Sequence, residues 1–401
     1  MNSGHRLERT ADVLVVGGGP AGLAAAAMLA AAGAGRVEVL ERERAAGGVP
    51  RHCARGGFGG LTGPAFARRA VRAAVRAGAV LRTGVSATGW AGPLSLVVTA
   101  PTGVERITAR AVVLATGARE RPRSARLVPG SRPAGVLSTG ELQQSVELFG
   151  LRRERIGRRA VVVGSDPIAR HAVRTLRRAG VPVAAVVADR PYGPRLPGPV
   201  LRGATVLELV GRGRLSGVLV RGADGRTGLL PCDTVVFTGD WLPDHELARS
   251  GGVSLDPATR GPSVDGGLRT LVPGVFAAGN LLRGVEPGTV AAAEGRAAAD
   301  AVLAHLAGAP WPAPGLTLKA AGALRRLTPG RLHPGGPAPT LLLRPEVRLV
   351  RPLLTVRQEG RLLYERRLPA LLEPHRSLRH PAVWAPDADA AGGPVVVTLT
   401  P

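Results

Sequence analysis

The residues best placed to do chemistry in this chain are the glycines that follow its first apolar segment. Val13–Val16 reads Val-Leu-Val-Val and leads directly into Gly-Gly-Gly-Pro-Ala-Gly at 17–22. Gly17 would let the chain turn sharply out of a strand, Gly19 would let the backbone approach a pyrophosphate, and Gly22 would let the next helix pack closely on the sheet. The helix N-terminus would then offer N–H groups and a positive dipole end to the phosphates. The pattern predicts a bound dinucleotide, with contacts at Gly17, Gly19, Pro20, Ala21 and Gly22.

An acidic residue stands where such a site needs one. A second apolar segment, 37–40, ends at Glu41, the nineteenth residue after Gly22. A carboxylate at that place can accept hydrogen bonds from the hydroxyls of a ribose. A glycine-rich turn in an ordinary α/β domain is the alternative, but the order strand, glycines, helix, strand and acid favours the dinucleotide site.

The combination of an apolar strand and a glycine turn recurs later in the chain. Residues 111–117 predict a buried strand that ends in Ala-Thr-Gly, after shorter alternating segments. Two more strands of this kind are expected at 159–164 and 234–238, and residues 275–280 read Val-Phe-Ala-Ala-Gly-Asn. This order predicts an α/β fold with two Rossmann-like dinucleotide-binding domains, the second inserted into the first.

The glycine turn of the second domain departs from the pattern. Residues 164–169 read Gly-Ser-Asp-Pro-Ile-Ala, which places Asp166 where the second glycine is expected. At roughly 5 Å and an effective dielectric near 20, repulsion between this carboxylate and a pyrophosphate costs about 3 kcal/mol. Asp189 still follows the next strand, where it could bind a ribose. We therefore predict a degenerate nucleotide site, with a working NAD(P) site as the alternative; its residues are Gly164, Asp166, Ala169 and Asp189.

Composition excludes several functions. The 401 residues carry a formal net charge of +24, yet Lys319 is the only lysine and aromatic residues are 3% of the chain. The arginines are spread along the chain without a stacking platform for bases, so we expect no nucleic-acid binding. Cys53 and Cys232 are the only cysteines and neither has metal-ligand spacing, so we expect no metal site. The uncharged run 13–32 has Gly-Gly-Gly-Pro within it, so we expect no membrane span and a cytoplasmic protein.

Three motifs extend over most of the chain. They are Gly-Gly-Gly-Pro-Ala-Gly at 17–22, Val-Leu-Ala-Thr-Gly-Ala-Arg-Glu-Arg-Pro at 113–122 and Gly-Val-Phe-Ala-Ala-Gly-Asn at 274–280. Together they resemble the FAD-dependent pyridine nucleotide-disulfide oxidoreductases, the glutathione-reductase-like class, and the resemblance reaches about residue 308. It implies bound FAD, while NAD(P) binding stays open because of Asp166.

Three further segments resemble a bacterial group within that class. They read Gly-Gly-Val-Pro-Arg-His-Cys at 47–53, Leu-Thr-Gly-Pro at 61–64 and Thr-Gly-Asp-Trp-Leu-Pro-Asp-His-Glu-Leu at 238–247. The group is similar to the FAD-bearing subunits of multi-subunit amino-acid and glycerol-3-phosphate-type dehydrogenases. This implies a companion dehydrogenase subunit as a possible partner.

The resemblance divides the chain into four segments. We expect the FAD-binding domain at 9–150 and 245–308, with an NAD(P)-binding-like domain inserted at 151–244. From Trp311 the composition changes to Pro, Leu and Arg. We expect a small, mostly β appendage at 309–401.

The resemblance also assigns roles to single residues. It implies that Glu41 binds the adenosine ribose, that Thr116 and Gly117 approach FAD through backbone groups, and that Asn280, next to Gly279, binds the ribityl chain. Asn280 replaces the aspartate usual in the class, but an amide oxygen also accepts hydrogen bonds. A helix beginning near Gly288 and Thr289 would direct its N-terminus at the flavin and stabilise the negative charge of the reduced ring. A plain N-cap role for Thr289 is compatible with this.

The cysteines and histidines allow several interpretations. The class's disulfide reductases carry two nearby cysteines after the flavin loop, whereas this chain has only Cys53, which predicts chemistry without a dithiol. By resemblance, His52 and Cys53 lie near the isoalloxazine as candidate catalytic residues, with Cys53 a thiolate if a cation is close. A structural cysteine beside a solvated histidine is the alternative. Cys232 is expected only to pack, while His245 and Glu246 could line an interdomain cleft or lie on the surface.

The leading functional hypothesis is an oxidoreductase in which FAD takes a hydride from a small organic substrate, or electrons from a partner flavoprotein, and passes them on. The first alternative is an NAD(P)H-dependent flavin reductase. The second is a non-catalytic electron-relay subunit, because no His/Asp/Glu constellation in the sequence marks a substrate.

Overall fold

The computed structural model describes residues 7–401 except 55, 192, 194, 197, 285, 334–337 and 370. The chain forms two compact units. The first consists of Met1–Arg51, Gly56–Ala118 and Pro243–Pro401, and the second of His52–Arg55 and Arg119–Leu242. We describe each unit by itself.

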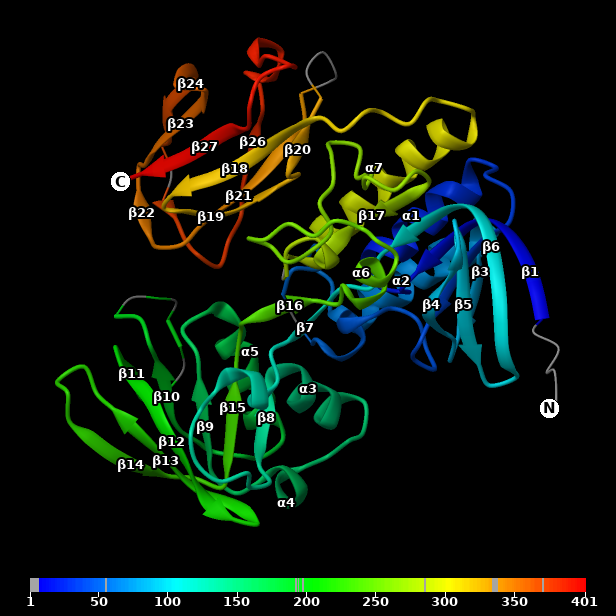
Figure 1. Ribbon diagram of the computed structural model, residues 1–401. Coiled ribbons are helices and arrows are strands. Elements are labelled where there is room, and N and C mark those ends of the chain that lie inside the picture. Colours follow the sequence, from blue (N-terminus) through cyan, green and yellow to red (C-terminus); the bar gives the residue numbers. More distant parts are fainter. Residues whose placement is uncertain are drawn as a thin grey trace. The chain divides into compact units, whose positions relative to one another are not determined.

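A seven-stranded sheet is the centre of the first unit (Figure 1). Its strands are β1 (Leu7–Val16), β2 (Val37–Glu41), β3 (Val80–Thr83), β4 (Ser86–Gly92), β5 (Ser95–Ala100), β6 (Gly103–Leu114) and β17 (Val275–Ala277). The order is β3-β2-β1-β6-β5-β4, and β17 also pairs with β6. β1 runs parallel to β2 and β6, whereas β4 and β5 form the antiparallel excursion. The parallel part therefore has the order expected of a dinucleotide-binding domain.

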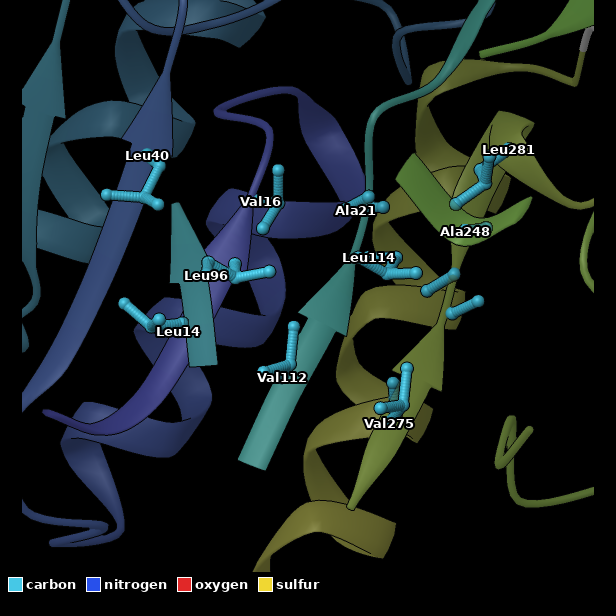
Figure 2. Packing of buried hydrophobic residues seen from close by; sticks show 14 of the residues in the cluster. Leu14, Val16, Ala21, Leu40, Leu96, Val112, Leu114, Ala248, Val275 and Leu281 are labelled. Atoms are coloured by element: carbon cyan, nitrogen blue, oxygen red, sulfur yellow. The ribbon is translucent and has the colours of Figure 1, made fainter. Parts of the chain in front are cut away.

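The apolar segment before the glycine motif is buried on both faces of this sheet. Leu14 and Val16 belong to one hydrophobic cluster, whereas Val13 and Val15 belong to another. Successive side chains of a strand point to opposite faces, so a continuous apolar run is what a strand covered on both sides requires. Figure 2 shows Leu14 and Val16 on β1, Leu114 on the neighbouring strand β6, and Val275 on β17 beyond it, all in the first cluster.

Helices cover the sheet of the first unit and connect its strands. They are α1 (Pro20–Ala31), α2 (Gly63–Arg76), α6 (Glu246–Ser250) and α7 (Gly288–Leu306), together with the 3-10 turns η1 (Val49–His52) and η3 (Gly279–Leu281). The alanines of α1 and the small residues of α7 permit a close approach. A Cβ built at Gly295 of α7 would lie 2.0 Å from the carbonyl oxygen of Ala21 in α1.

The second unit contains a smaller parallel sheet of five strands in the order β11-β10-β9-β15-β8. The strands are β8 (Val136–Ser138), β9 (Ala160–Val163), β10 (Val183–Ala188), β11 (Val200–Arg202) and β15 (Thr234–Phe237). The helical segments are η2 (Arg123–Arg126), α3 (Thr139–Glu147), α4 (Arg153–Ile156) and α5 (Pro167–Arg178). An antiparallel sheet of β12 (Thr205–Arg212), β13 (Arg214–Arg221) and β14 (Thr227–Pro231) follows β11. The connecting strands β7 (Ala118–Glu120) and β16 (Trp241–Pro243) pair with each other.

The C-terminal part of the chain is a β-domain with its own hydrophobic core, which includes Trp384. A five-stranded sheet has the order β20-β18-β27-β23-β24, and two smaller sheets pair β19-β21-β26 and β22-β25. The elements are β18 (Leu316–Gly322), β19 (Leu324–Thr328), β20 (Arg331–Leu332), β21 (Thr340–Pro345), β22 (Leu349–Val350), β23 (Leu353–Gln358), β24 (Arg361–Arg367), β25 (Leu371–Leu372), β26 (Leu378–Pro381), η4 (Ala385–Asp387) and β27 (Val395–Thr400). We call residues 309–401 the C-terminal β-domain.

The structure corrects the expected boundaries of the inserted domain. We expected it at 151–244, but the second unit begins at Arg119, because β8 pairs with β15 and extends the parallel sheet. Leu142 of α3 lies in the same hydrophobic cluster as Leu176 of α5, which ties the preceding helix to this unit as well. The C-terminal β-domain groups with the first unit.

The close packing of α7 on α1 predicts a size limit at Gly295. Gly295→Ala should lower the free energy of unfolding by about 1–3 kcal/mol, because the added methyl group has no room beside Ala21. Urea denaturation followed by circular dichroism measures this. Gly89→Ala is the matched control, since no heavy atom lies within 4 Å of a Cβ built there. Equal stability of the two variants would contradict the packing argument.

Candidate cofactor site

Three of the four glycines of the first motif, Gly17, Gly19 and Gly22, have different environments. Gly17 has a φ of +108°, and a Cβ on it would lie 2.4 Å from the carbonyl oxygen of Ala115. A Cβ on Gly22 would lie 2.0 Å from the carbonyl oxygen of Gly17, so the helix can pack here only without a side chain. Gly19 has no heavy atom within 4 Å of such a Cβ. The open space before Gly19 is where a pyrophosphate would meet the backbone.

The N-terminus of α1 is not capped by a side chain. Gly19 is the N-cap residue, Pro20 occupies the first turn, and no side chain of the described residues accepts a hydrogen bond there. The first N–H groups of a helix have no intrahelical partners and carry the positive end of its dipole. This end of α1 therefore has the donors that a phosphate of FAD requires. Ala21, the next position, is buried.

Glu41 ties the glycine motif to the end of β2. Its carboxylate is buried, and its two oxygens accept hydrogen bonds from the backbone N–H groups of Gly18 at 2.9 Å and Glu43 at 2.8 Å. Each carboxylate oxygen keeps a further lone pair for a ribose hydroxyl. The sequence reasoning missed the bond to Gly18, where a Cβ would lie 2.9 Å from Glu41 Oε2.

Thr116 and Gly117 follow β6 and are hydrogen-bonded to Asp244, which lies just after the first unit resumes at Pro243. The Thr116 hydroxyl donates to the carbonyl oxygen of Asp244 at 2.7 Å, and the Asp244 N–H donates to the carbonyl oxygen of Gly117 at 2.9 Å. These bonds fix the backbone that, by resemblance, approaches FAD. Their role toward the cofactor stays a prediction.

Gly279 and Asn280 are positioned by residues nearer the C-terminus. Gly279 has a φ of +77°, and a Cβ on it would lie 2.7 Å from that of Ala21. Its N–H donates to Glu294 Oε2 at 3.1 Å. The Asn280 amide holds a loop, because its Oδ1 accepts from the N–H of Glu286 at 2.8 Å and its Nδ2 donates to the carbonyl oxygen of Glu286 at 3.4 Å. The amide oxygen still has one lone pair for a ribityl hydroxyl.

The start of α7 differs from the expected N-cap. The helix begins at Gly288, as expected, but Pro287 is the N-cap residue without a side-chain cap, so the alternative role of Thr289 as the N-cap is not found. The Thr289 N–H donates to the carbonyl oxygen of Gly57 at 3.2 Å. A Cβ on Gly288 would lie 3.1 Å from the ring of Phe58. The glycine-rich loop after η1 therefore contacts the N-terminus that was expected to face the flavin.

In the second unit, the N-terminus of the corresponding helix, α5, is capped by a side chain. Asp166 is the N-cap of α5, and its Oδ1 accepts hydrogen bonds from the N–H groups of Ile168 at 2.8 Å and Ala169 at 3.1 Å. Thr238 Oγ1 donates to the same carboxylate at 3.4 Å. A Cβ on Gly239 would lie 2.3 Å from Asp166 Oδ2. The carboxylate thus occupies the space between the ends of β9 and β15, where a doubly wound domain binds its nucleotide phosphates.

The other residues of the predicted degenerate site lie nearby in this unit. Gly164 has a φ of +150°, and a Cβ on it would lie 1.9 Å from Thr238 Oγ1. Asp189 follows β10, is exposed, and accepts a hydrogen bond from Ser165 Oγ at 2.6 Å. Asp189 therefore lies where the sequence predicts a ribose-binding residue, whereas the N–H groups of Ile168 and Ala169 are already bonded to Asp166.

Cys53 lies in an environment that opposes a thiolate. Its Sγ donates to Gln143 Oε1 at 3.2 Å. Burial, together with the nearby carboxylates of Glu120 and Glu147, raises the pKa of the Cys53 thiol to about 12. This environment argues against the thiolate interpretation and favours a structural cysteine. His52 is buried, so the solvated histidine of that alternative is not found.

Cys232 and the His245–Glu246 pair follow the simpler expectations. Cys232 is buried in a hydrophobic cluster with Val161 and Phe237. His245 is half-buried at the start of α6, and Glu246 is exposed. The packing role of Cys232 agrees with its burial, and exposure of Glu246 favours the surface alternative.

Glu120 is a functional candidate that the sequence reasoning did not single out, although it belongs to the motif at 113–122. It is buried, and its Oε2 accepts a hydrogen bond from the N–H of Gly140 in α3 at 2.6 Å. Burial raises the pKa of the Glu120 carboxyl to about 7, although the Gly140 N–H, Ser138 and Arg126 lower it. The charge of Asp166 raises it further. The carboxyl groups of Glu120 and Asp166 are therefore close enough for the charge of Asp166 to affect the pKa of Glu120.

The described part of the chain contains neither a candidate metal site nor a candidate membrane-spanning helix. No group of three or more His, Cys, Asp or Glu side chains there could hold a metal ion. No helix among the described residues is long and apolar enough to cross a membrane.

The site and fold define an FAD-dependent oxidoreductase with two dinucleotide-binding domains. Residues 11–197 match the family model described as pyridine nucleotide-disulphide oxidoreductase. No curated protein matches the chain.

Solved structures share this fold at low sequence identity. The thioredoxin reductase of T. acidophilum is 23% identical with a TM-score of 0.61, covering 74% of this chain and 99% of its own. The L-proline dehydrogenase of P. horikoshii is 19% identical with a TM-score of 0.61, covering 77% of this chain and 58% of its own. The NAD-dependent persulfide reductase of A. fulgidus is 20% identical with a TM-score of 0.56, covering 73% of this chain and 59% of its own. At these identities the likeness shows the fold alone.

The comparisons show the fold and leave chemistry without a dithiol as a prediction. That prediction rests on the cysteines alone. Both are free thiols, and Cys53 bonds to Gln143.

The open space at Gly19 predicts a selective loss of cofactor. Gly19→Val should fold, because nothing lies within 4 Å of the added Cβ, but its side chain would stand where the pyrophosphate binds. Bound FAD should fall from about one per chain to almost none. Denaturation and chromatography of the released flavin measure this, with Gly89→Val as the control. Full FAD content in the Gly19 variant would show that the pyrophosphate does not bind at this turn.

The shifted pKa of Glu120 predicts a pH-dependent stability. Between pH 4.5, the usual pKa of a glutamate carboxyl, and about pH 7 the folded chain binds up to one more proton than the unfolded chain. The stability due to this group is therefore present below pH 4.5 and is lost as the pH rises to 7. Glu120→Gln should remove about 3 kcal/mol of this pH dependence. Denaturant titrations at pH 5 and 8 measure the difference, with the exposed Glu154→Gln as control. The same slope in wild type and the Glu120 variant would contradict the assignment.

Proposed function

We propose that FAD in this protein takes a hydride from a small organic substrate, or electrons from a partner flavoprotein, and not from NAD(P)H. The observation that carries the proposal is the contrast between two helix N-termini. At α1 none of the side chains that the structure describes caps the first turn, whereas at α5 the Asp166 carboxylate accepts from the N–H groups of Ile168 and Ala169. A second anion, the pyrophosphate of NAD(P)H, would compete with this carboxylate for the same donors and would also be repelled by its charge.

The chain's own residues support a site for FAD in the first unit. The backbone around Gly19 receives the pyrophosphate, Glu41 receives the adenosine ribose, and Asn280 receives the ribityl chain. The bound FAD supplies the redox chemistry by accepting two electrons at its isoalloxazine ring. The protonated Cys53 takes no part as a charge-transfer donor in this proposal, and neither cysteine forms a redox pair.

An NAD(P)H-dependent flavin reductase is the second candidate, and one observation favours it. Asp189 lies after β10 in the position of a ribose acceptor, hydrogen-bonded to Ser165. The two candidates differ in the electron donor, so the same flavin can report on both. A companion dehydrogenase subunit and a cytoplasmic location belong to the first proposal and rest on the sequence resemblance.

Anaerobic stopped-flow absorbance at the flavin band tests the proposed electron source. NADH and NADPH should bleach the flavin slowly or not at all, because Asp166 occupies the phosphate position. Asp166→Gly, which frees the donors and removes the charge, should increase the affinity for NADH. Asp166→Ser is the matched control, because serine keeps a helix cap without the charge.

The outcomes separate the two candidates. Rapid, saturable bleaching of the wild-type flavin at micromolar NADH would reject the proposal and establish the reductase. No gain in either variant would show that features other than Asp166 prevent binding.

A further inference from the structure

A buried polar network connects the C-terminal β-domain to the loop between η3 and α7 in the first unit. Its centre is Glu286, whose side chain is almost fully buried. The carboxylate Oε1 accepts hydrogen bonds from Arg344 of β21 at 2.5 Å and from the Ser377 hydroxyl at 2.5 Å. Arg344 Nε also donates to Ser377 Oγ at 3.2 Å. Two side chains of the C-terminal β-domain therefore converge on one carboxylate of the cofactor-binding domain.

The backbone of Glu286, whose side chain is held by Arg344 and Ser377, is hydrogen-bonded to Asn280. Both the N–H and the carbonyl group of Glu286 are hydrogen-bonded to the Asn280 side chain. The amide can present its remaining lone pair in only one direction while both bonds are made. The position of Glu286 thus sets the orientation of the group that is proposed to meet the ribityl chain.

A second route reaches the neighbouring residue, Gly279. Arg283 is fully buried, with its Nε 3.6 Å from Glu286 Oε1 and its Nη2 bonded to Glu294 Oε1. The other oxygen of Glu294 accepts from the N–H of Gly279 at 3.1 Å. The C-terminal β-domain also supports this route, because Arg326 Nη1 donates to the carbonyl oxygen of Arg283 at 2.8 Å.

Stability alone does not explain a buried ionic network of this kind. Burial raises the pKa of Glu294 and lowers that of Arg344, because the loss of hydrating water disfavours the charged form of each group. Buried ion pairs recover this desolvation cost only with good geometry, and apolar residues of similar volume often stabilise a protein as well or better. What charged pairs with several hydrogen bonds provide is a defined orientation.

We propose that the C-terminal β-domain positions the cofactor, with Arg344 and Ser377 as positioning residues that hold Glu286 and, through it, Asn280. This inference rests on the proposed FAD site. It gives the appendage a role in the redox centre of the first unit without any contact between its own residues and FAD.

The test measures FAD release from the holoprotein after dilution, followed by the rise of flavin fluorescence. Arg344→Gln should speed release about tenfold, because it removes a charge-assisted hydrogen bond to Glu286. Arg367→Gln is the matched control, because this exposed arginine of β24 bonds only to the carbonyl oxygen of Arg351 among the contacts described. Ser377→Ala, a milder change, should act in the same direction and keeps the test valid if Arg344→Gln does not fold.

A double-variant comparison separates positioning from general destabilisation. If Arg344 acts through Asn280, then Arg344→Gln added to Asn280→Ala should change FAD release by less than about twofold beyond Asn280→Ala alone. Multiplicative effects of the two changes would overturn the proposal, as would unchanged release in both Arg344→Gln and Ser377→Ala. Wild-type protein that binds no FAD would instead reject the cofactor site itself.

Discussion

The free N–H groups at the start of a helix are the constraint on which this structure depends. They cannot be satisfied within the helix, so another group must accept their hydrogen bonds. At α1 no described side chain does so, and Gly19 leaves open space in front of them. At α5 Asp166 accepts from two of them. The same fold therefore presents one helix end ready for a phosphate and one that is closed by its own carboxylate.

Small residues make the open site possible. Gly22 and Gly295 allow α1 to pack against the glycine turn on one side and against α7 on the other, with no room for a Cβ at either place. Glu41 then fixes the turn by accepting the Gly18 N–H. The proposed cofactor site is thus held in place by packing and by backbone hydrogen bonds, and such preorganisation reduces the entropic cost of binding a ligand.

The two units differ in what surrounds their buried carboxyl groups. In the first, both buried carboxylates have arginine partners: Glu294 pairs with the nearby Arg283, and Glu286 pairs with Arg344 of the distant strand β21. In the second, Glu120 lies buried near Asp166, and its proton is retained to near neutral pH. The first arrangement holds a loop in place. The second keeps a region that binds nucleotides in related folds filled with the protein's own acidic groups.

The sequence by itself determined the α/β class, the dinucleotide-binding motif and the unusual aspartate at position 166, because strand periodicity and glycine spacing are local properties. It did not determine that the second unit begins near Arg119, since the pairing of β8 with β15 joins segments about a hundred residues apart. It also did not show that Cys53 is a protonated thiol bonded to Gln143, or that Glu286 is held by Arg344. Those features depend on burial and on partners from distant segments, which only the tertiary structure brings together.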